Sequence, residues 1–352
     1  MVENAHRYGS YKRPGRATVL CILGVASVLL VAGGVAYQCI ASAGESRLYP
    51  RTGDLVLVGN QRMHIHCEGD GSPAVILDAG LGDSSAVWGL VQPEVAKFTK
   101  VCAYDRAGLG WSEPAENPRT SNQIARELEV LLTRTPVQGP YVLVGHSFGG
   151  YNQRVFASHH RDKIVGMILV DAAQPDQNNE VSASVRIDYY VRRKVGILTI
   201  LLGVRRILGW CADDYEFPNV PPAWARIAPT VIAQGCRFSR WWTRRAEMIS
   251  FRESGDEAAA AGSLGNVPLV VLSHDPRTGT GFPPAPPNQA ELRWDRMQEE
   301  LTALSSNGKR VVAKNSMHYI QAYRPDLVVR AIQEVYNSAK SGKSIAAKMT
   351  YE

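Results

Sequence analysis

The chain has 352 residues, of which 45% are hydrophobic and 20% charged, so most of it is expected to fold as one large globular domain or two small ones. Part of the net charge of +6 lies in the first sixteen residues, where Glu3 stands against Arg7, Lys12, Arg13 and Arg16. No basic stripe with interleaved aromatic residues is present in the sequence, which argues against a nucleic-acid partner.

Residues 17–44 contain no charged side chain, and this length is enough for a helix to cross a bilayer. The stretch is longer than the apolar part of a typical signal peptide, although Ala41-Ser42-Ala43 matches a cleavage site. Because the basic residues precede it, residues 1–16 are expected to stay cytoplasmic. The sequence predicts a single-pass cell-membrane protein with an exported domain; the alternative is a secreted protein released by cleavage.

Strand-like and helix-like segments alternate along the rest of the chain, which predicts an α/β fold whose mostly parallel sheet has helices on both faces. The expected strands are residues 54–60, 62–69, 74–80, 100–105, 141–147, 163–171, 267–275 and 309–314. The expected helices are residues 121–132, with Ser121 as N-cap, 148–160, 288–305 and 325–339.

One region interrupts this alternation. Residues 175–265 have no strand pattern and are rich in tryptophan, arginine and helical stretches, so they are expected to form a helical cap. The cap would divide the core into a first part, residues 53–174, and a second part, residues 266–338. Residues 339–352 are expected to be a flexible tail.

The segment GHSFG matches the pattern G-x-S-x-G and lies between an expected strand and an expected helix. There, Ser147 would occupy a sharp turn that lifts its hydroxyl group above the sheet, and Gly145 and Gly149 would allow close backbone approach. Backbone N–H groups at the start of the helix would face developing negative charge. We interpret Ser147 as a nucleophile; the alternative is a serine that only caps the helix.

A nucleophilic serine needs a histidine base and an acid, in the chain order serine, acid, histidine. Of the eight histidines, only His318 follows the last expected strand, in a loop at the same sheet edge as Ser147. We interpret His318 as the base; the alternative is an ordinary surface histidine. The acid is Asp171 or Asp275, since each ends a strand at that edge. Strand-end position favours Asp171, which has a helix N-cap as its alternative role.

The loop LDAGLGDSSAVW follows the third expected strand and can supply half of an oxyanion hole. Its donor would be the N–H of Leu81, between Gly80 and Gly82, and the second donor would be the N–H of Phe148. The alternative is an ordinary glycine turn.

Four segments, DAGLGDSSAVW, CAYDRAGLGWSEP, GPYVLVGHSFGG and GMILVDAAQPDQ, together resemble the alpha/beta-hydrolase family, over about residues 53–337 outside the cap. The likeness is greatest to exported or membrane-anchored bacterial serine hydrolases, with proline iminopeptidase-like and haloperoxidase-like relatives. It implies an eight-stranded sheet with an antiparallel second strand and a structural role for the DRAGLGWS turn. The chain departs from the family pattern in NSMHY, which lacks the usual glycine before the histidine, and in its acid loop, where Arg277 and Thr278 stand at the usual acid position.

The leading functional hypothesis is a serine hydrolase that cleaves carboxylic esters through an acyl-enzyme intermediate, without a metal or organic cofactor. A serine nucleophile argues against epoxide hydrolase or dehalogenase chemistry, which in this family uses an aspartate. One alternative is an aminopeptidase or amidase, for which Asp213, Asp214 and Glu216 would hold a substrate ammonium group. The other is a non-catalytic ligand-binding protein on the same fold.

Four cysteines lie outside the apolar segment, and an even number in an exported domain suggests disulfides; the alternative is four buried thiols. We expect a Cys211–Cys236 bridge within the cap. The resemblance implies neighbouring second and fourth strands, and hence a Cys67–Cys102 bridge.

The cap also contains an apolar stretch between basic residues, Val191–Trp210, which is too short to span a bilayer. It is interpreted as an interfacial segment or as a lid over an acyl pocket, both of which favour apolar or lipid-like esters. The alternative is a cap helix buried against the core.

Overall fold

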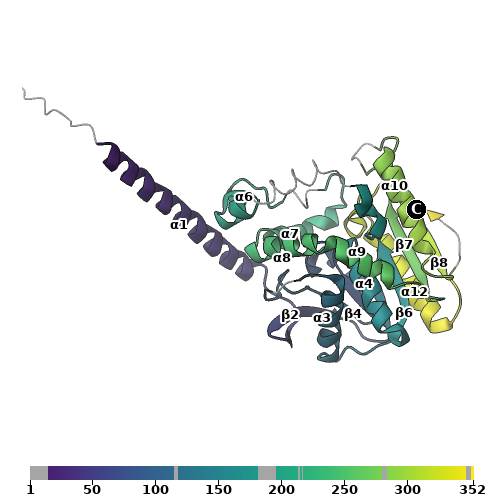
Figure 1. Cartoon of the computed structure of the whole chain (residues 1–352). Coiled ribbons are helices and arrows are strands. Elements are labelled where there is room, and N and C mark those ends of the chain that lie inside the picture. The colour runs from purple at the N-terminus through teal and green to yellow at the C-terminus, as the bar shows by residue number, and fades with distance from the viewer. Residues whose placement is uncertain are drawn as a thin grey trace, which may run out of the picture.

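A nine-stranded sheet forms the centre of the structure, a computed structural model (Figure 1). The structure describes residues 15–114, 118–180, 196–212, 215, 217–279, 284–345 and 350–352. The strand order is β1-β2-β4-β3-β5-β6-β7-β8-β9. The strands are β1 (Asp54–Val58), β2 (Gln61–Glu68), β3 (Ala74–Asp78), β4 (Val101–Tyr104), β5 (Tyr141–His146), β6 (Ile164–Val170), β7 (Leu269–His274), β8 (Gly308–Ala313) and β9 (Thr350–Tyr351).

Strand β2 is antiparallel to both of its neighbours, β1 and β4, whereas the pairs from β4 to β9 are parallel. The central strands are buried along their length because helices cover both faces, which explains their continuous apolar sequences. The carboxyl ends of β5, β6, β7 and β8 therefore meet at one edge of the sheet, and the loops that follow them carry the candidate site.

Two sets of helices cover the two faces of the sheet. One hydrophobic cluster includes buried residues of α3 (Ser121–Thr133), α4 (Phe148–His159), α9 (Phe251–Ala260) and α10 (Gln289–Thr302). The other includes residues of η1 (Ser85–Trp88), α2 (Gln92–Val95), α11 (Ile320–Tyr323) and α12 (Pro325–Ser341). This three-layer arrangement is the α/β architecture predicted from the sequence.

Among its described residues, the segment between β6 and β7 consists of helices, turns and loops and contains no named strand. It begins with η3 (Pro175–Glu180), and a helical stretch at residues 196–201 precedes α6 (Val204–Ile207). It continues with η4 (Pro222–Arg226), α7 (Ala228–Gly235), α8 (Phe238–Ile249) and α9. Residues 181–195, which include the start of the Val191–Trp210 stretch, lie outside the described residues.

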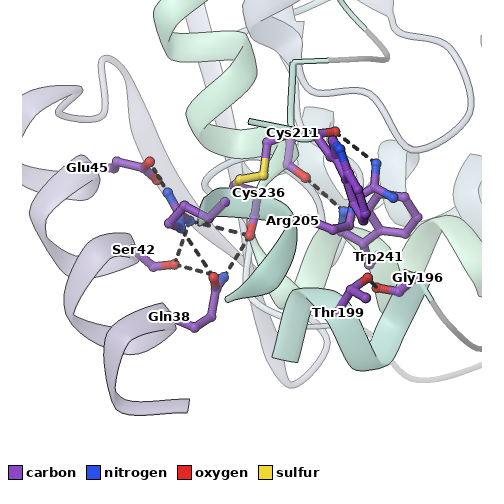
Figure 2. The surroundings of a disulfide bond; sticks show 12 residues. Gln38, Ser42, Glu45, Gly196, Thr199, Arg205, Cys211, Cys236 and Trp241 are labelled. Carbon is purple, nitrogen blue, oxygen red and sulfur yellow. Dashed lines mark hydrogen bonds and ion pairs between the residues drawn. A yellow bond between two sulfur atoms is a disulfide. The ribbon is translucent and has the colours of Figure 1, made fainter. Parts of the chain in front are cut away.

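Both expected disulfides are present in the structure. Cys67 and Cys102 face each other across β2 and β4. Cys211 and Cys236 join the segment after α6 to the end of α7 (Figure 2). Cys21 and Cys39 are free and lie on α1.

The apolar N-terminal segment forms α1 (Arg16–Leu48), which projects from the rest of the molecule (Figure 1). Among the described residues it is the one helix long and apolar enough to cross a membrane. Its most apolar window is not covered by any other part of the described structure.

The structure differs from the sequence-based expectations at the C-terminus and at one helix start. Helix α12 continues to Ser341, and β9 pairs with β8, so the expected flexible tail includes ordered elements and the sheet has nine strands rather than eight. The N-cap of α3 is Thr120, whose hydroxyl group accepts a hydrogen bond from the Gln123 N–H, and Ser121 is the first helical residue.

Candidate active site

Ser147 occupies the turn between β5 and α4 in an unusual backbone conformation. Its φ of 50° and ψ of −119° hold a non-glycine residue in a rarely populated region, and such strain is typical of functional sites. A Cβ atom at Gly149 would lie 2.6 Å from the carbonyl oxygen of Asp78, so only glycine fits there. The turn thus depends on its glycines, and the Ser147 side chain remains partly exposed at the sheet edge.

His318 contacts Asp171 at this edge. The Nδ1 atom of His318 lies 2.6 Å from Oδ2 of Asp171, which follows β6 directly. The Asp171 side chain is fully buried, whereas that of His318 is 41% exposed. The buried carboxylate can therefore orient the imidazole while the other side of the ring stays accessible.

Asp171 accepts hydrogen bonds from more than one partner. His274 donates from its backbone N–H to Oδ1 and approaches Oδ2 with Nδ1 at 2.8 Å, and the indole N–H of Trp294 donates to Oδ1 at 2.9 Å. Burial alone would raise the pKa of Asp171, but His274 and His318 outweigh it and hold the pKa well below its ordinary value. Asp171 is therefore an ionised acceptor at neutral pH.

His274 lies between two carboxylates. Besides its contact with Asp171, its Nε2 atom lies 2.8 Å from Oε2 of Glu291 on α10. Burial opposes protonation, but the charge of Asp171 and the hydrogen bonds to both carboxylates raise the pKa of His274 to about 10. His274 is thus an imidazolium ion that links Asp171 to Glu291.

Asp275, the alternative acid, has different partners. Its carboxylate forms an ion pair with Arg277 at 2.8 Å and accepts a hydrogen bond from the N–H of Asn315. Burial would raise its pKa, but the hydrogen bonds from Arg277 lower it to about 2. The structure therefore brings Asp171 into contact with His318 and pairs Asp275 with Arg277.

The expected oxyanion donors lie on two neighbouring segments. Phe148 is the first residue of α4, so its N–H has no acceptor within the helix. Leu81 lies in the loop after β3, and its side chain packs on the core cluster that contains Phe148.

A buried arginine holds this loop. Arg106 donates to the carbonyl oxygens of Ala79 and Gly80, each at 2.7 Å, and pairs with Asp78 at 2.6 Å. Its Nε atom also donates to Glu247 of α8 at 2.7 Å. Because unpaired charge is costly in the interior, these contacts are expected to fix the position of the loop.

The cap contacts the other side of the same loop. A second oxygen of Glu247 accepts a hydrogen bond from the N–H of Gly82 at 2.8 Å, and Arg240 donates to the carbonyl oxygen of Gly82 at 2.9 Å. A Cβ atom at Gly82 would overlap the Arg244 side chain, so the loop also needs glycine here. The loop after β3 is thus held between Arg106 of the core and two residues of α8, Glu247 and Arg240.

Further buried polar groups surround the candidate base. His146 is fully buried, and its Nε2 atom lies 3.1 Å from the carbonyl oxygen of His318. Burial, and then the nearby His318, lower the pKa of His146 to about 3, so it is neutral and donates from Nε2. Tyr319 and Tyr215 each donate to Asp83 at 2.9 Å, which connects the histidine loop to the cap.

Sequence reasoning missed several of these residues. His274 belongs to the expected strand at residues 267–275, and Glu291 and Trp294 belong to the expected helix at residues 288–305; none of the three is predicted to lie at the site. In the structure Leu272 of β7 pairs with Val170 of β6, which brings His274 and Asp171 to the same edge of the sheet. Within the described residues, no group of three or more His, Cys, Asp or Glu side chains is arranged to hold a metal ion.

Comparisons with known proteins agree with this fold. A family model described as alpha/beta hydrolase fold matches residues 73–192. An esterase from Thermogutta terrifontis superposes with a TM-score of 0.57 at 20% identity, over 81% of this chain and 97% of its own. The haloalkane dehalogenase DatA from Agrobacterium tumefaciens superposes with a TM-score of 0.59 at 16% identity, over 81% and 97%. The chain therefore has the alpha/beta-hydrolase fold, as its motifs predict.

A curated relative matches most of the chain. The uncharacterized protein YqjL of Bacillus subtilis is 27% identical over 275 residues, which are 78% of this chain and 87% of the relative. Because similar folds include an esterase and a dehalogenase, the reaction must be argued from the site residues rather than from the fold.

Proposed function

We propose that the protein is a serine hydrolase that cleaves carboxylic esters through an acyl-enzyme intermediate. The observation that carries the proposal is the contact of His318 with buried Asp171 at the sheet edge where Ser147 occupies a strained turn. Ser147, Asp171 and His318 come after the parallel strands β5, β6 and β8, in the chain order serine, acid, histidine that is typical of this fold.

In this mechanism the Oγ atom of Ser147 attacks the carbonyl carbon of the ester. His318 accepts the serine proton at Nε2 and then donates it to the leaving alcohol, while Asp171 holds Nδ1–H and stabilises the imidazolium ion. The N–H groups of Leu81 and Phe148 stabilise the tetrahedral oxyanion. Water, activated by His318, then hydrolyses the acyl-enzyme and releases the acid.

An apolar groove beside the histidine supports apolar esters as substrates. The groove has a volume of about 600 Å³. Its lining is formed by Tyr215, Phe217, Pro218, Val220, Pro221, Pro222, Trp224, Ala225, Ala228 and Ile232. The ring of Phe217 lies 4.6 Å from that of Tyr319, the neighbour of His318. An acyl or alkoxy chain in this groove would contact apolar side chains, and each buried methylene contributes about 0.8 kcal/mol.

The alternative functions have less support from the structure. An aminopeptidase would need an acidic cluster for the substrate ammonium, and Asp213, Asp214 and Glu216, the residues suggested for it, lie outside the described residues. A non-catalytic binding protein would not need a buried carboxylate beside an accessible histidine. These alternatives remain outcomes of the following test.

A fluorophosphonate probe tests the proposed nucleophile directly. The full-length protein should be labelled at Ser147, and Ser147→Ala should remove both the labelling and the hydrolysis of p-nitrophenyl esters. Ser341→Ala, an exposed serine at the end of α12, is the matched control and should react like the wild type. Labelling that survives in Ser147→Ala would disprove the assignment, and faster hydrolysis of aminoacyl anilides than of esters would favour the peptidase alternative.

A further inference from the structure

Helix α1 has a change in environment near its middle. From Arg16 to Gly33 every residue is exposed, and partial burial against the rest of the protein begins at Gly34. A bilayer core of about 30 Å is crossed by about 20 helical residues. If Arg16 lies at the cytoplasmic head groups, the span ends near Ala36, close to where protein contacts begin.

The cap contacts α1 at this level. A Cβ atom at Gly34 would lie 2.6 Å from the carbonyl oxygen of Leu202, and one at Gly203 would lie 2.7 Å from the ring of Tyr37. Figure 1 shows the same arrangement, with α6 beside the part of α1 that is nearer to the domain. Residues 202–203 therefore lie at the height where α1 leaves the hydrocarbon.

Polar contacts fix the cap against the next two turns of α1 (Figure 2). Gln38 donates to the carbonyl oxygen of Cys236 at 2.8 Å, and Arg206 donates to Ser42 and pairs with Glu45. Arg237 donates to Ser46 at 3.0 Å. These groups lie beyond the end of the span, where water and head groups are present. The hydrogen bonds and the ion pair between them hold the cap in one orientation relative to the span.

The chain on either side of residues 202–203 exposes large apolar side chains. We call this group the cap patch: Leu198, Leu201, Ile207, Leu208 and Trp210, with exposed fractions from 38% for Leu201 to 65% for Ile207. Adjacent exposed apolar side chains of this size usually mark a contact surface. Tyr37 and Trp210 also match the aromatic residues that are enriched at membrane–water interfaces.

We propose that the cap patch inserts into the outer leaflet of the bilayer that α1 spans, so that the cap is held on the membrane surface. The proposal rests on α1 as an uncleaved span and is independent of the serine hydrolase assignment. The cap patch lies beside the end of the span, where a lipid surface is present whenever α1 crosses the membrane. Lipid is therefore the partner that we assign to the patch.

The apolar groove and the interior of the cap share one residue. Ile232 lines the groove and also packs against the small cluster of Ile200, Cys211, Cys236 and Trp241. Phe217, which also lines the groove, lies 4.6 Å from the ring of Tyr319, the neighbour of the candidate base. An ester that leaves the outer leaflet beside the cap would thus meet apolar side chains that extend to the neighbour of His318.

Tryptophan fluorescence in nanodiscs tests the insertion. The full-length protein is reconstituted into phosphatidylcholine nanodiscs whose acyl chains carry bromine, which quenches nearby indoles, and the Trp210 signal is taken as the difference from Trp210→Phe. We expect quenching of Trp210, and a decrease of this quenching by about threefold or more in Leu198→Gln/Ile207→Gln, since both side chains would lose apolar transfer energy. The matched control, Leu57→Gln/Leu292→Gln, changes two exposed leucines that lie outside the cap, on β1 and α10, and should leave the quenching unchanged.

Two results would overturn the proposal: absence of Trp210 quenching in the wild type, or equal quenching in the patch variant and the control variant. Loss of α1 by cleavage, seen as release of the domain from membranes, would overturn it as well. The same quenching is expected in Ser147→Ala, so a failure of the proposed catalysis and a failure of the membrane contact give different results.

Discussion

Asparagine in place of Asp171 should separate the two candidate acids. Asp171 is buried and accepts a hydrogen bond from His318 Nδ1 at 2.6 Å, a distance typical of a charge-assisted contact. An asparagine amide can donate instead, which favours the histidine tautomer that cannot accept the serine proton. We expect kcat to fall by about 10³- to 10⁴-fold, which corresponds to about 4–5.5 kcal/mol.

Asp275→Asn is the matched control, since it makes the same chemical change at the end of the neighbouring strand. The ion-pair partner of Asp275 is Arg277, whose side chain is 49% exposed, so solvent screening keeps the loss of stability small. Its contact with the N–H of Asn315 lies in the loop before His318. We therefore expect a decrease in kcat of no more than about threefold, below about 0.7 kcal/mol.

Both variants are compared as full-length protein in detergent, with p-nitrophenyl butyrate as substrate and thermal unfolding as the check on folding. The expected result is a large loss of kcat for Asp171→Asn at a melting temperature that still indicates a folded protein. An equal or larger loss of kcat for Asp275→Asn would refute the assignment and identify Asp275 as the acid.

Three further predictions concern stability and the cap. Because the pKa of His274 is raised from 6.5 to about 10, the stability that its protonated form contributes is complete below pH 6.5 and is lost as pH rises through 10. His274→Gln should therefore lower the free energy of unfolding by about 3 kcal/mol near pH 7 and by progressively less up to pH 10, as measured by chemical unfolding. A difference between variant and wild type that stays constant over this pH range would contradict the prediction. Glu247→Gln removes a charge paired with Arg106 and should lower kcat about tenfold; a lower melting temperature with unchanged kcat would limit the pair to a structural role. Replacing Cys211 and Cys236 by serine opens a loop of sequence separation 25 and should cost about 3 kcal/mol in unfolding assays, and no change would mean that the bridge adds no stability.

The fold and two of the candidate residues could be predicted because they depend on local patterns. Apolar runs of four to eight residues with glycine-rich ends identify the buried strands. The ends of these strands predict that Ser147 and His318 lie in loops at one edge of the sheet. The disulfide between neighbouring strands also follows once the family topology is known, since Cys67 and Cys102 occupy paired positions. These features need only the order of the strands.

The acid and its environment depend on side-chain direction, which strand order does not determine. Asp171 and Asp275 both end parallel strands, and only the packing of the two loops shows that Asp171 reaches His318 while Asp275 meets Arg277. The link from His274 to Glu291 joins residues 17 positions apart through the start of α10. The pairing of Arg106 with Glu247 joins residues separated by 141 positions, and no local sequence pattern specifies it.

The contact between Glu247 and the loop after β3 has a consequence for the motion of the cap. Glu247 belongs to the cap, yet it accepts hydrogen bonds from Gly82 and Arg106, which form the floor of the candidate site. A rigid-body opening of the cap would remove this carboxylate and leave a buried guanidinium group with one anionic partner, Asp78. A hinge motion of the cap would therefore disturb the loop that is proposed to carry the Leu81 donor, whereas ligand exchange that leaves α8 in place would keep this loop assembled.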